Sequence, residues 1–543
     1  MGVRRQKNCK GVKFRAPLGT APKKKRMQIP SPVIERLDPQ TLRGIRRGVE
    51  KESLRTASDG SLATTPHPAA LGSALTHPHI TTDYSEAQLE LITSVHETPQ
   101  ACVAQLAQIH QFTLRALDSE MLWASSMPCR LPAEDQIPIG RYGSSNVGQA
   151  KSVYRMGLAH RYGRRMQTIS GIHYNWSMPG VDSADYFALI RNFRRHAFLL
   201  LYLLGASPAL DACFVQGRPH ELKTLSEGTL YMPHGTSLRM GRLGYQSEAQ
   251  ASLAVSYNNL DGYAASLHEA LTRPYPAYEA IGVRDAQGHY QQLATSLLQI
   301  ENEFYGTIRP KRNIFPGERP LHALRERGVE YVEVRLLDLD PFESLGVNTQ
   351  AMHLIDVFLL HCLLSDSPLD SPQEIAQIGR NQHKTAAFGR QPGLQLERGQ
   401  GWVGLTDWGH ELMQAMEPLA ARVDAVWGGQ AHRQAVLNAR ALLDAPERLP
   451  SARVLDVMAS DYGNSFLAFG LDRSRRIRAD LLSQPWEPTA QAHFAALSEK
   501  SLQDQRQIEA SDSLPFEVYR HQYISPERLG LSRSAIAPAL AAP

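Results

Sequence analysis

Cysteine is scarce in this chain, and its spacing fits no known framework. The 543 residues contain five cysteines, and no two of them form a CxxC pair; they are Cys9, Cys102, Cys129, Cys213 and Cys362. An odd, scattered set argues against a disulfide scaffold and against a cysteine-based zinc site. We therefore expect reduced thiols and a cytoplasmic protein.

Long hydrophobic runs are also missing. The richest run, residues 198–206, is under half of the roughly 20 residues that a membrane-spanning helix needs. No apolar stretch follows the basic N-terminus, which excludes a secretory signal peptide.

Neither a Walker A loop nor a kinase-type glycine loop with its companion lysine is present. Any phosphoryl transfer must therefore rely on metal ions and arginines.

Acidic residues are absent from the first 26 residues, which carry ten lysines and arginines. Without these ten charges, the formal net charge of +4 becomes −6 for the remaining chain. We expect residues 1–27 to form a basic disordered tail, because like charges repel and glycine and proline interrupt the run. The body, residues 28–543, is expected to be one catalytic unit that binds neither nucleic acid nor membrane.

Hydrophobic periodicity predicts an α+β chain. Residues 41–95 combine short strands with turns, and residues 328–340 alternate as a strand does. Helices are expected over 100–125, 185–205, 250–272 and 345–366, and the part from about 405 to 543 is mostly helical.

The first group of candidate site residues is a pair of carboxylates. Alternate residues of a strand share a face, so Glu50 and Glu52 would lie side by side. Two like charges placed together cost free energy unless a cation joins them. A solvated surface strand would also explain this pair.

A second acidic group comprises Asp83, Glu86 and Glu90. A separation of four residues places Glu86 and Glu90 on one face of a helix or of a strand. Asp83 and Glu86 also match a helix-capping box. Capping leaves Glu90, which has leucines on both sides, unexplained.

Two strand-like segments add further polar groups. Glu333 and Arg335 alternate with Val332 and Val334, so an acid and an arginine share a polar face, as an ion pair also would. His173 would share a face with Gly171, which leaves room for a ligand beside the backbone. A hydrogen-bonded core histidine is the alternative.

Two further segments are rich in arginine and tyrosine. The first supplies Arg239, Arg242 and Tyr245, and the second supplies Glu301, Glu303, Tyr305, Arg309, Lys311 and Arg312. Basic groups beside acids suit a phosphate or a carboxylate substrate. Solvated loops would have the same composition. If all of these segments converge, the clustered carboxylates suit Mg²⁺ bridged to nucleotide phosphates.

Several motifs together resemble the proteobacterial type of glutamate–cysteine ligase. They are GIRRGVEKESLR, GSLATTPHPAALGSALTHPHITTDYSEAQLELIT, YGSSNVG, RMQTISGIHYNWSMP, GTSLRMGRLGY, LLQIENEFYGTIRPKR and EYVEVRLLDLDPF. They follow the family's order and spacing over roughly residues 41–520. The resemblance implies a glutamine synthetase-like core, with a curved, mostly antiparallel sheet whose concave face carries metal ligands.

The same resemblance implies the reaction and the site. The family joins glutamate to cysteine with ATP through a γ-glutamyl phosphate, the first step of glutathione synthesis. The implied metal ion is Mg²⁺, which Mn²⁺ could replace. Its implied ligands are Glu50, Glu52, Asp83, Glu90, His173 and Glu333. The implied substrate and catalytic residues are Arg239 for glutamate, Arg335 for the phosphoryl group, Tyr154, Tyr245 and Tyr305 for cysteine, and Gln167 and Gly171 for the facing wall.

The expected partners are L-glutamate, L-cysteine and ATP, and a monomer is expected. Two other functions stay open at this point. A related ligase would keep the acids and arginines and use a different amine. A binding protein with an inactive ligase fold would lack ATP turnover.

Overall fold

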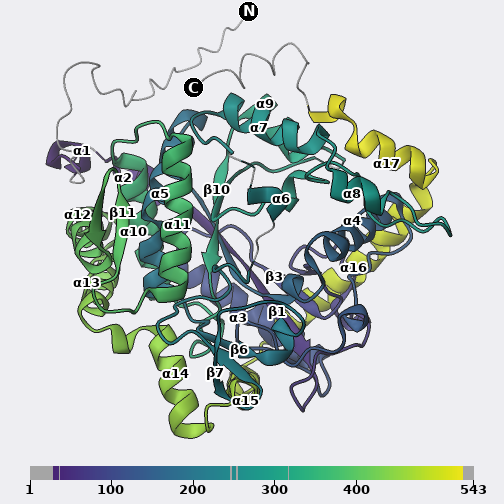
Figure 1. Cartoon of the computed structure of the whole chain (residues 1–543), viewed down its shortest axis with the longest axis horizontal. Helices are drawn as coiled ribbons and strands as arrows, with labels where there is room; N and C mark the ends of the chain where they lie inside the picture. Colours follow the sequence, from purple (N-terminus) through teal and green to yellow (C-terminus); the bar gives the residue numbers. More distant parts are fainter. Residues whose placement is uncertain are drawn as a thin grey trace, which may run out of the picture.

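The computed structural model describes residues 29–35, 37–244, 248–251, 253, 255–315 and 317–529 (Figure 1). A seven-stranded sheet forms the centre, with the order β2-β3-β1-β5-β10-β9 and with β4 paired to the end of β1. All of its named strand pairs are antiparallel. Its strands are β1 (Arg46–Thr56), β2 (Ile80–Thr82), β3 (Gln88–Ile92), β4 (Met121–Leu122), β5 (Ile172–Ser177), β9 (Ile308–Lys311) and β10 (Tyr331–Leu337). The predicted α+β class with an antiparallel sheet is confirmed.

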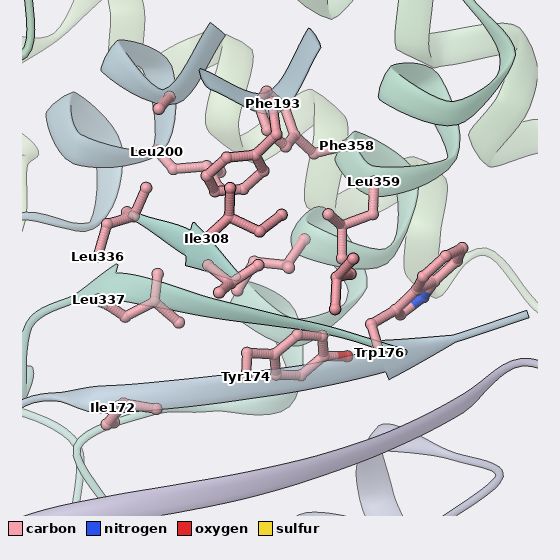
Figure 2. Close-up of a cluster of buried hydrophobic side chains, with 14 of the residues drawn as sticks. Ile172, Tyr174, Trp176, Phe193, Leu200, Ile308, Leu336, Leu337, Phe358 and Leu359 are labelled. Atoms are coloured by element: carbon pink, nitrogen blue, oxygen red, sulfur yellow. The ribbon is translucent and has the colours of Figure 1, made fainter. Parts of the chain in front are cut away.

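One face of this sheet is apolar because hydrophobic residues occupy every second position. In β5 the buried Tyr174 and Trp176 alternate with His173 and Asn175. Figure 2 shows these apolar side chains, together with those of β9 and β10, packed against Phe193 and neighbouring helix residues. The helices that cover this face are α5 (Ser183–Leu204) and α10 (Thr349–Leu364). This packing leaves the polar face of the sheet turned toward the opposite side of the molecule.

Helices lie on both sides of the sheet (Figure 1). On the side of α5 and α10 that faces away from the sheet lie α11 (Pro372–Phe388), α12 (Leu405–Trp427) and α13 (Ala431–Asp444). The other side carries α4 (Asn146–Tyr162), α16 (Pro488–Ser511) and α17 (Phe516–Ile524). The remaining helices are α1 (Ser31–Glu35), α2 (Pro39–Arg43), α3 (Pro99–Ala116), α6 (Glu248–Ala251), α7 (Leu260–Thr272), α8 (Pro276–Ile281), α9 (Pro320–Arg327), α14 (Pro450–Asp461) and α15 (Phe466–Ser483).

Two small sheets complete the fold. One contains β6 (Ala209–Asp211), β7 (Lys223–Ser226) and β8 (Thr229–Tyr231), and the other contains β11 (Gln395–Arg398) and β12 (Gly401–Gly404). In the part of the chain that the structure describes, no helix combines the length and the apolar character needed to cross a bilayer. The predicted basic tail, residues 1–27, lies outside the described residues.

Most predicted elements are present, and two of their boundaries were wrong. The helices expected over 185–205 and 345–366 correspond to α5 and α10, and the chain after residue 405 is mostly helical. The helix expected over 100–125 ends at Ala116, because the chain turns there to pair β4 with β1. The helix expected over 250–272 begins only at Leu260, where the Asn259 side chain accepts a hydrogen bond from the backbone of Gly262.

Candidate active site

Strand register brings the predicted acids together on the polar face of the sheet. Glu50 lies opposite His173, and Glu52 lies opposite Glu90. Directly opposed residues of antiparallel strands have neighbouring Cβ atoms. Glu333 follows two strands along, opposite Asn175 and Arg309. Segments far apart in the sequence therefore form one continuous polar surface.

His173 lies at the centre of these carboxylates. Its Nδ1 is 3.1 Å from Glu50 Oε2 and 3.7 Å from Glu333 Oε1, and its Nε2 is 3.5 Å from Glu52 Oε1. Burial and the Arg335 charge lower the pKa of His173, although its hydrogen bond to Glu50 acts in the opposite direction. A neutral imidazole keeps a lone pair, as a metal ligand must. Asn175 Nδ2 donates to Glu50 Oε1 over 2.8 Å and orients that carboxylate.

Two of the carboxylates are held in an unfavourable environment. Burial and the charge of Asp83 raise the pKa of Glu52 to about 8. Burial and the charges of Glu50, Asp83 and Glu52 raise the pKa of Glu90 well above its usual value. Glu52 is only 2% exposed, so the solvated-strand explanation is wrong for it. A bound dication would relieve this repulsion and favour the charged forms.

Glu333 is surrounded by cations. It lies 3.1 Å from Arg335 Nη1, 3.5 Å from Lys311 Nζ and 4.0 Å from Arg309 Nη1. Burial disfavours its charged form, but Lys311 and Arg335 outweigh burial and hold the pKa of Glu333 well below its usual value. The expected ion pair with Arg335 therefore exists within the carboxylate cluster. Glu333 Oε2 accepts no hydrogen bond from any residue that the structure describes, which leaves it available to a ligand.

Donor geometry supports a metal ion at this cluster. One donor atom each from Glu50, His173 and Glu333 lies within 4.8 Å of the other two, and Glu52, Glu90 and His173 form a second set of this kind. Oxygen-rich sites of this type suit Mg²⁺. The residues present thus fit the metal that the sequence predicted, and His173 adds one nitrogen.

Asp83 contributes from the turn between β2 and β3. The helix-capping interpretation of Asp83 and Glu86 was wrong, because Asp83 N and Gln88 N donate within a hairpin turn. Glu86 instead accepts from the backbone nitrogens of His67 and Arg141, over 3.0 and 2.8 Å. Glu86 therefore fixes the loops around the site.

Gly171 and Arg239 are packed against each other. A Cβ at position 171 would lie 2.5 Å from Arg239 Nε and closer still to Arg239 Cζ and Nη2. Arg239 Nη2 donates to the Arg335 carbonyl over 2.8 Å, and the Gly171 amide donates to Glu52 Oε2 over 2.7 Å. The space that glycine provides is thus filled by an arginine. Arg239 is 2% exposed and lies behind the cavity wall.

A cavity of about 440 Å³ covers the clustered carboxylates except Glu50, which does not line it. Its walls include Tyr154, Gln167 and Tyr305, and Gln167 Nε2 donates to Tyr305 Oη over 2.8 Å. Its floor includes Glu52, Asp83, Glu90, His173, Glu333 and Arg335. Tyr245, the third expected cysteine-pocket tyrosine, lies outside the described residues.

Two cavity walls were not predicted from the sequence, apart from Tyr154 on α4. Helix α4 contributes Val147, Ala150, Lys151, Tyr154, Arg155 and Leu158, which follow one helical face. Burial and Arg155 lower the pKa of Lys151 to about 8. Helix α17 contributes Tyr519 and Tyr523, whose stacked rings are 5.9 Å apart. The spacing on α4 was a usable signal, but nothing in the sequence connected α17 to the site.

This geometry defines a class of protein: an enzyme with a carboxylate-floored cavity, bordered by cations, on an antiparallel sheet. Residues 33–385 match the family model described as glutamate-cysteine ligase. The chain belongs to the glutamate–cysteine ligase family.

Individual relatives agree with the family model over most of the chain. The glutamate–cysteine ligase of Pseudomonas paraeruginosa is 48% identical over 88% of this chain and 93% of its own length. That of Alcanivorax borkumensis is 46% identical over 89% and 96%. The structure is similar to that of the Francisella tularensis glutamate–cysteine ligase in complex with AMP, with a TM-score of 0.84, 35% identity and coverage of 89% and 97%. The Pasteurella multocida bifunctional glutathione synthetase shares the fold, with a TM-score of 0.68, 24% identity and coverage of 87% and 58%.

Proposed function

We propose that this chain joins the side-chain carboxyl of L-glutamate to the amine of L-cysteine, with ATP, and forms γ-glutamylcysteine, ADP and phosphate. This is the first step of glutathione biosynthesis. The observation that carries the proposal is the convergence of Glu52, Glu90, His173, Glu333 and Arg335 in one cavity, in a chain of the glutamate–cysteine ligase family.

The chemistry requires activation of a carboxylate, which is a poor electrophile. Transfer of the ATP γ-phosphoryl group gives γ-glutamyl phosphate, and the cysteine amine then displaces phosphate. Mg²⁺, or Mn²⁺ in its place, held by Glu50, Glu52, Asp83, Glu90, His173 and Glu333, would neutralise phosphate charge. Enclosing walls matter as well, because water would hydrolyse the acyl phosphate.

The arginines have separate tasks in this proposal. Arg335 lines the cavity beside Glu333 and stabilises the phosphoryl group as its charge develops. Lys311 and Arg309 extend the same cationic border and suit the other phosphates. The family pattern assigns Arg239 to the glutamate carboxylate, although its side chain lies behind the cavity lining and not in it. Asp338 accepts hydrogen bonds from Ser207 and Ser237 and anchors the loop that carries Arg239.

The cysteine substrate is assigned to Tyr154 and Tyr305, together with Tyr245 from the family pattern. Gln167 is assigned to the wall that faces the substrates, and Gly171, the other wall residue of the family pattern, packs against Arg239. Aromatic groups suit the small cysteine side chain, and amide groups suit its polar amine and carboxylate. We also propose a monomeric cytoplasmic enzyme whose folded body binds no nucleic acid.

One assay separates these roles from the open alternatives. Phosphate release from ATP is measured with glutamate alone, with glutamate and cysteine, and with glutamate and other amines. The proposal expects fast release and γ-glutamylcysteine only with cysteine. A preference for another amine would indicate a related ligase, and no turnover with any amine would indicate a binding protein.

A further inference from the structure

A second cluster of metal-binding side chains lies on the opposite side of the sheet from the cavity. His353 and Asp356 lie one turn apart on α10, and His432 lies in the first turn of α13. All three are at most 6% exposed. His353 Nδ1 and His432 Nε2 are 3.1 Å apart, and one donor atom from each of the three residues lies within 4.8 Å of the other two.

The outer nitrogens of both imidazoles have hydrogen-bond partners. His432 Nδ1 is 2.9 Å from Asp424 Oδ1, and Asp424 also accepts from the backbone nitrogens of His432 and Arg433. The proton of His432 therefore lies on Nδ1, and the lone pair of Nε2 faces His353. His353 Nε2 is 3.0 Å from Gln100 Nε2 on α3. A 180° rotation of this amide places its oxygen there as the acceptor of the His353 Nε2 proton, which leaves the lone pair of His353 Nδ1 facing His432. Metal-binding histidines are oriented by such carboxylate and amide partners.

Asp356 has an incompletely satisfied carboxylate. Its Oδ1 accepts from the Tyr174 hydroxyl over 2.7 Å, and its Oδ2 is 3.0 Å from Arg47 Nη2. Oδ2 nevertheless accepts no well-aligned hydrogen bond from the described residues, and it is buried. Arg47 supplies the positive charge that this buried oxygen needs, and the lone pair that no well-aligned hydrogen bond uses is available to a ligand.

We propose that His353, His432 and Asp356 bind a divalent transition-metal ion of the zinc type. Two imidazole nitrogens and one carboxylate oxygen form a typical three-residue set for zinc, with water as the fourth ligand, whereas Mg²⁺ prefers oxygen alone. The nitrogen separation of 3.1 Å is close to that expected between two ligands of a tetrahedral ion about 2 Å from each.

The formal charges around the cluster are compatible with a bound divalent cation. Arg47, Asp356 and Asp424 together carry a formal charge of −1, which a dication converts to +1. The ion would join α10 to α13. Through Asp356, it would also brace Arg47 on β1 and Tyr174 on β5, the strands that carry Glu50 and His173. Its expected role is therefore to stabilise the layer behind the active site.

The test uses the full chain with excess Mg²⁺ to occupy the carboxylate cluster. Zn²⁺ is titrated, and the bound metal is counted by mass spectrometry after gel filtration. Wild type and Glu52→Gln should each retain one tightly bound Zn²⁺ that His432→Gln lacks. In Co²⁺-loaded protein, the visible absorption bands of a four-coordinate ion should persist in Glu52→Gln and disappear in His432→Gln. Zn²⁺ removal should lower the Tm of wild type and leave that of His432→Gln unchanged.

The opposite results would overturn the proposal. Equal Zn²⁺ content in wild type and His432→Gln would mean that the two imidazoles share only a proton. If His432→Gln does not fold, the Co²⁺ spectrum of wild type decides, with His353→Gln as the second variant: no four-coordinate band in wild type contradicts the site. All these readouts are independent of ligase turnover, so failure here leaves the proposed reaction untouched.

Discussion

At the scale of single residues, charge burial distinguishes the proposed metal-binding acids from ordinary ones. Glu333 is 1% exposed among three cations, whereas Glu330, three residues earlier, is exposed and its side chain pairs with Asn313 and Arg312 of the neighbouring loop. The two residues are chemically identical, so their environments alone assign different roles. Substitutions that keep shape and remove charge test this difference.

Glu333→Gln and Glu50→Gln should each lower kcat at least 100-fold, about 2.7 kcal/mol in transition-state free energy. The reason is loss of a carboxylate from the proposed metal-binding cluster, not loss of the fold. The measurement is phosphate release over a range of Mg²⁺ concentrations, with thermal unfolding as a check. Glu330→Gln is the matched control and should stay within about twofold of wild type. Wild-type turnover of both site variants at saturating Mg²⁺ would contradict the assignment.

Arg239→Lys and Arg335→Lys should affect different kinetic constants. Lysine keeps the charge but loses the bidentate geometry of arginine. Arg239 is assigned to a carboxylate present in ground and transition states alike, so Arg239→Lys should mainly raise the KM for glutamate. Arg335 is assigned to the charge that develops during transfer, so Arg335→Lys should mainly lower kcat. A reversed pattern in stably folded variants would require the two roles to be exchanged.

Gly171→Ala should displace the Arg239 guanidinium, because a methyl group there has no space. We expect kcat/KM for glutamate to fall at least 100-fold, as small misplacements of positioning groups do. Steady-state kinetics with glutamate as the varied substrate measures this change. Gly379→Ala in α11 is the control, since a Cβ there meets no atom within 4 Å. The control should retain wild-type kinetics and gain up to about 1 kcal/mol in stability; normal kinetics for Gly171→Ala would rule out the packing role.

At the scale of elements, alternation and periodicity in the sequence predicted most helices and strands and the faces of the strands. The register between strands could not be predicted from them. The faces of β1, β5 and β10 followed from the sequence, because hydrophobic residues occupy every second position. Alternation does not say which residues of different strands lie opposite each other, so the contact of Glu50 with His173 needed the structure. Lys151 and Arg155 were missed because the cavity face of α4 mixes apolar and charged side chains.

Helix α10 should make stability depend on pH. Burial lowers the pKa of His361 to about 4, below its unfolded value near 6.5. The folded state therefore binds fewer protons than the unfolded state between pH 6.5 and 4. Stability is full above pH 6.5 and falls as the pH drops through that window.

Between pH 7 and pH 5, His361 alone should reduce the free energy of unfolding by about 2 kcal/mol. Urea unfolding at both pH values measures this change in wild type and in His361→Gln. Between the two pH values, the free energy of unfolding of His361→Gln should fall by about 2 kcal/mol less than that of wild type. His493→Gln is the control, because His493 is exposed on α16. An equal loss in wild type and His361→Gln would mean that the buried imidazole does not titrate in this window.

At the scale of the whole molecule, the ten basic charges near the N-terminus lie outside the family motifs. Deleting residues 1–27 should leave kcat and KM nearly unchanged, because the described fold and cavity contain none of them. Kinetics of the shortened and full chains side by side provide the measurement. A tenfold loss, about 1.4 kcal/mol, would instead make the tail part of the active unit.

The position of α17 has a consequence for synthesis of the chain. Tyr519 and Tyr523 line the same cavity as residues of β1 and α4, which are made more than 350 residues earlier. Helix α17 is held there by Arg319, which donates to the Tyr523 carbonyl, and by Arg520, which donates to that of Leu293. A growing chain can assemble the carboxylate floor long before it can close the wall. The site therefore stays open on the ribosome, and a chain released before residue 516 would have the acids without the enclosure.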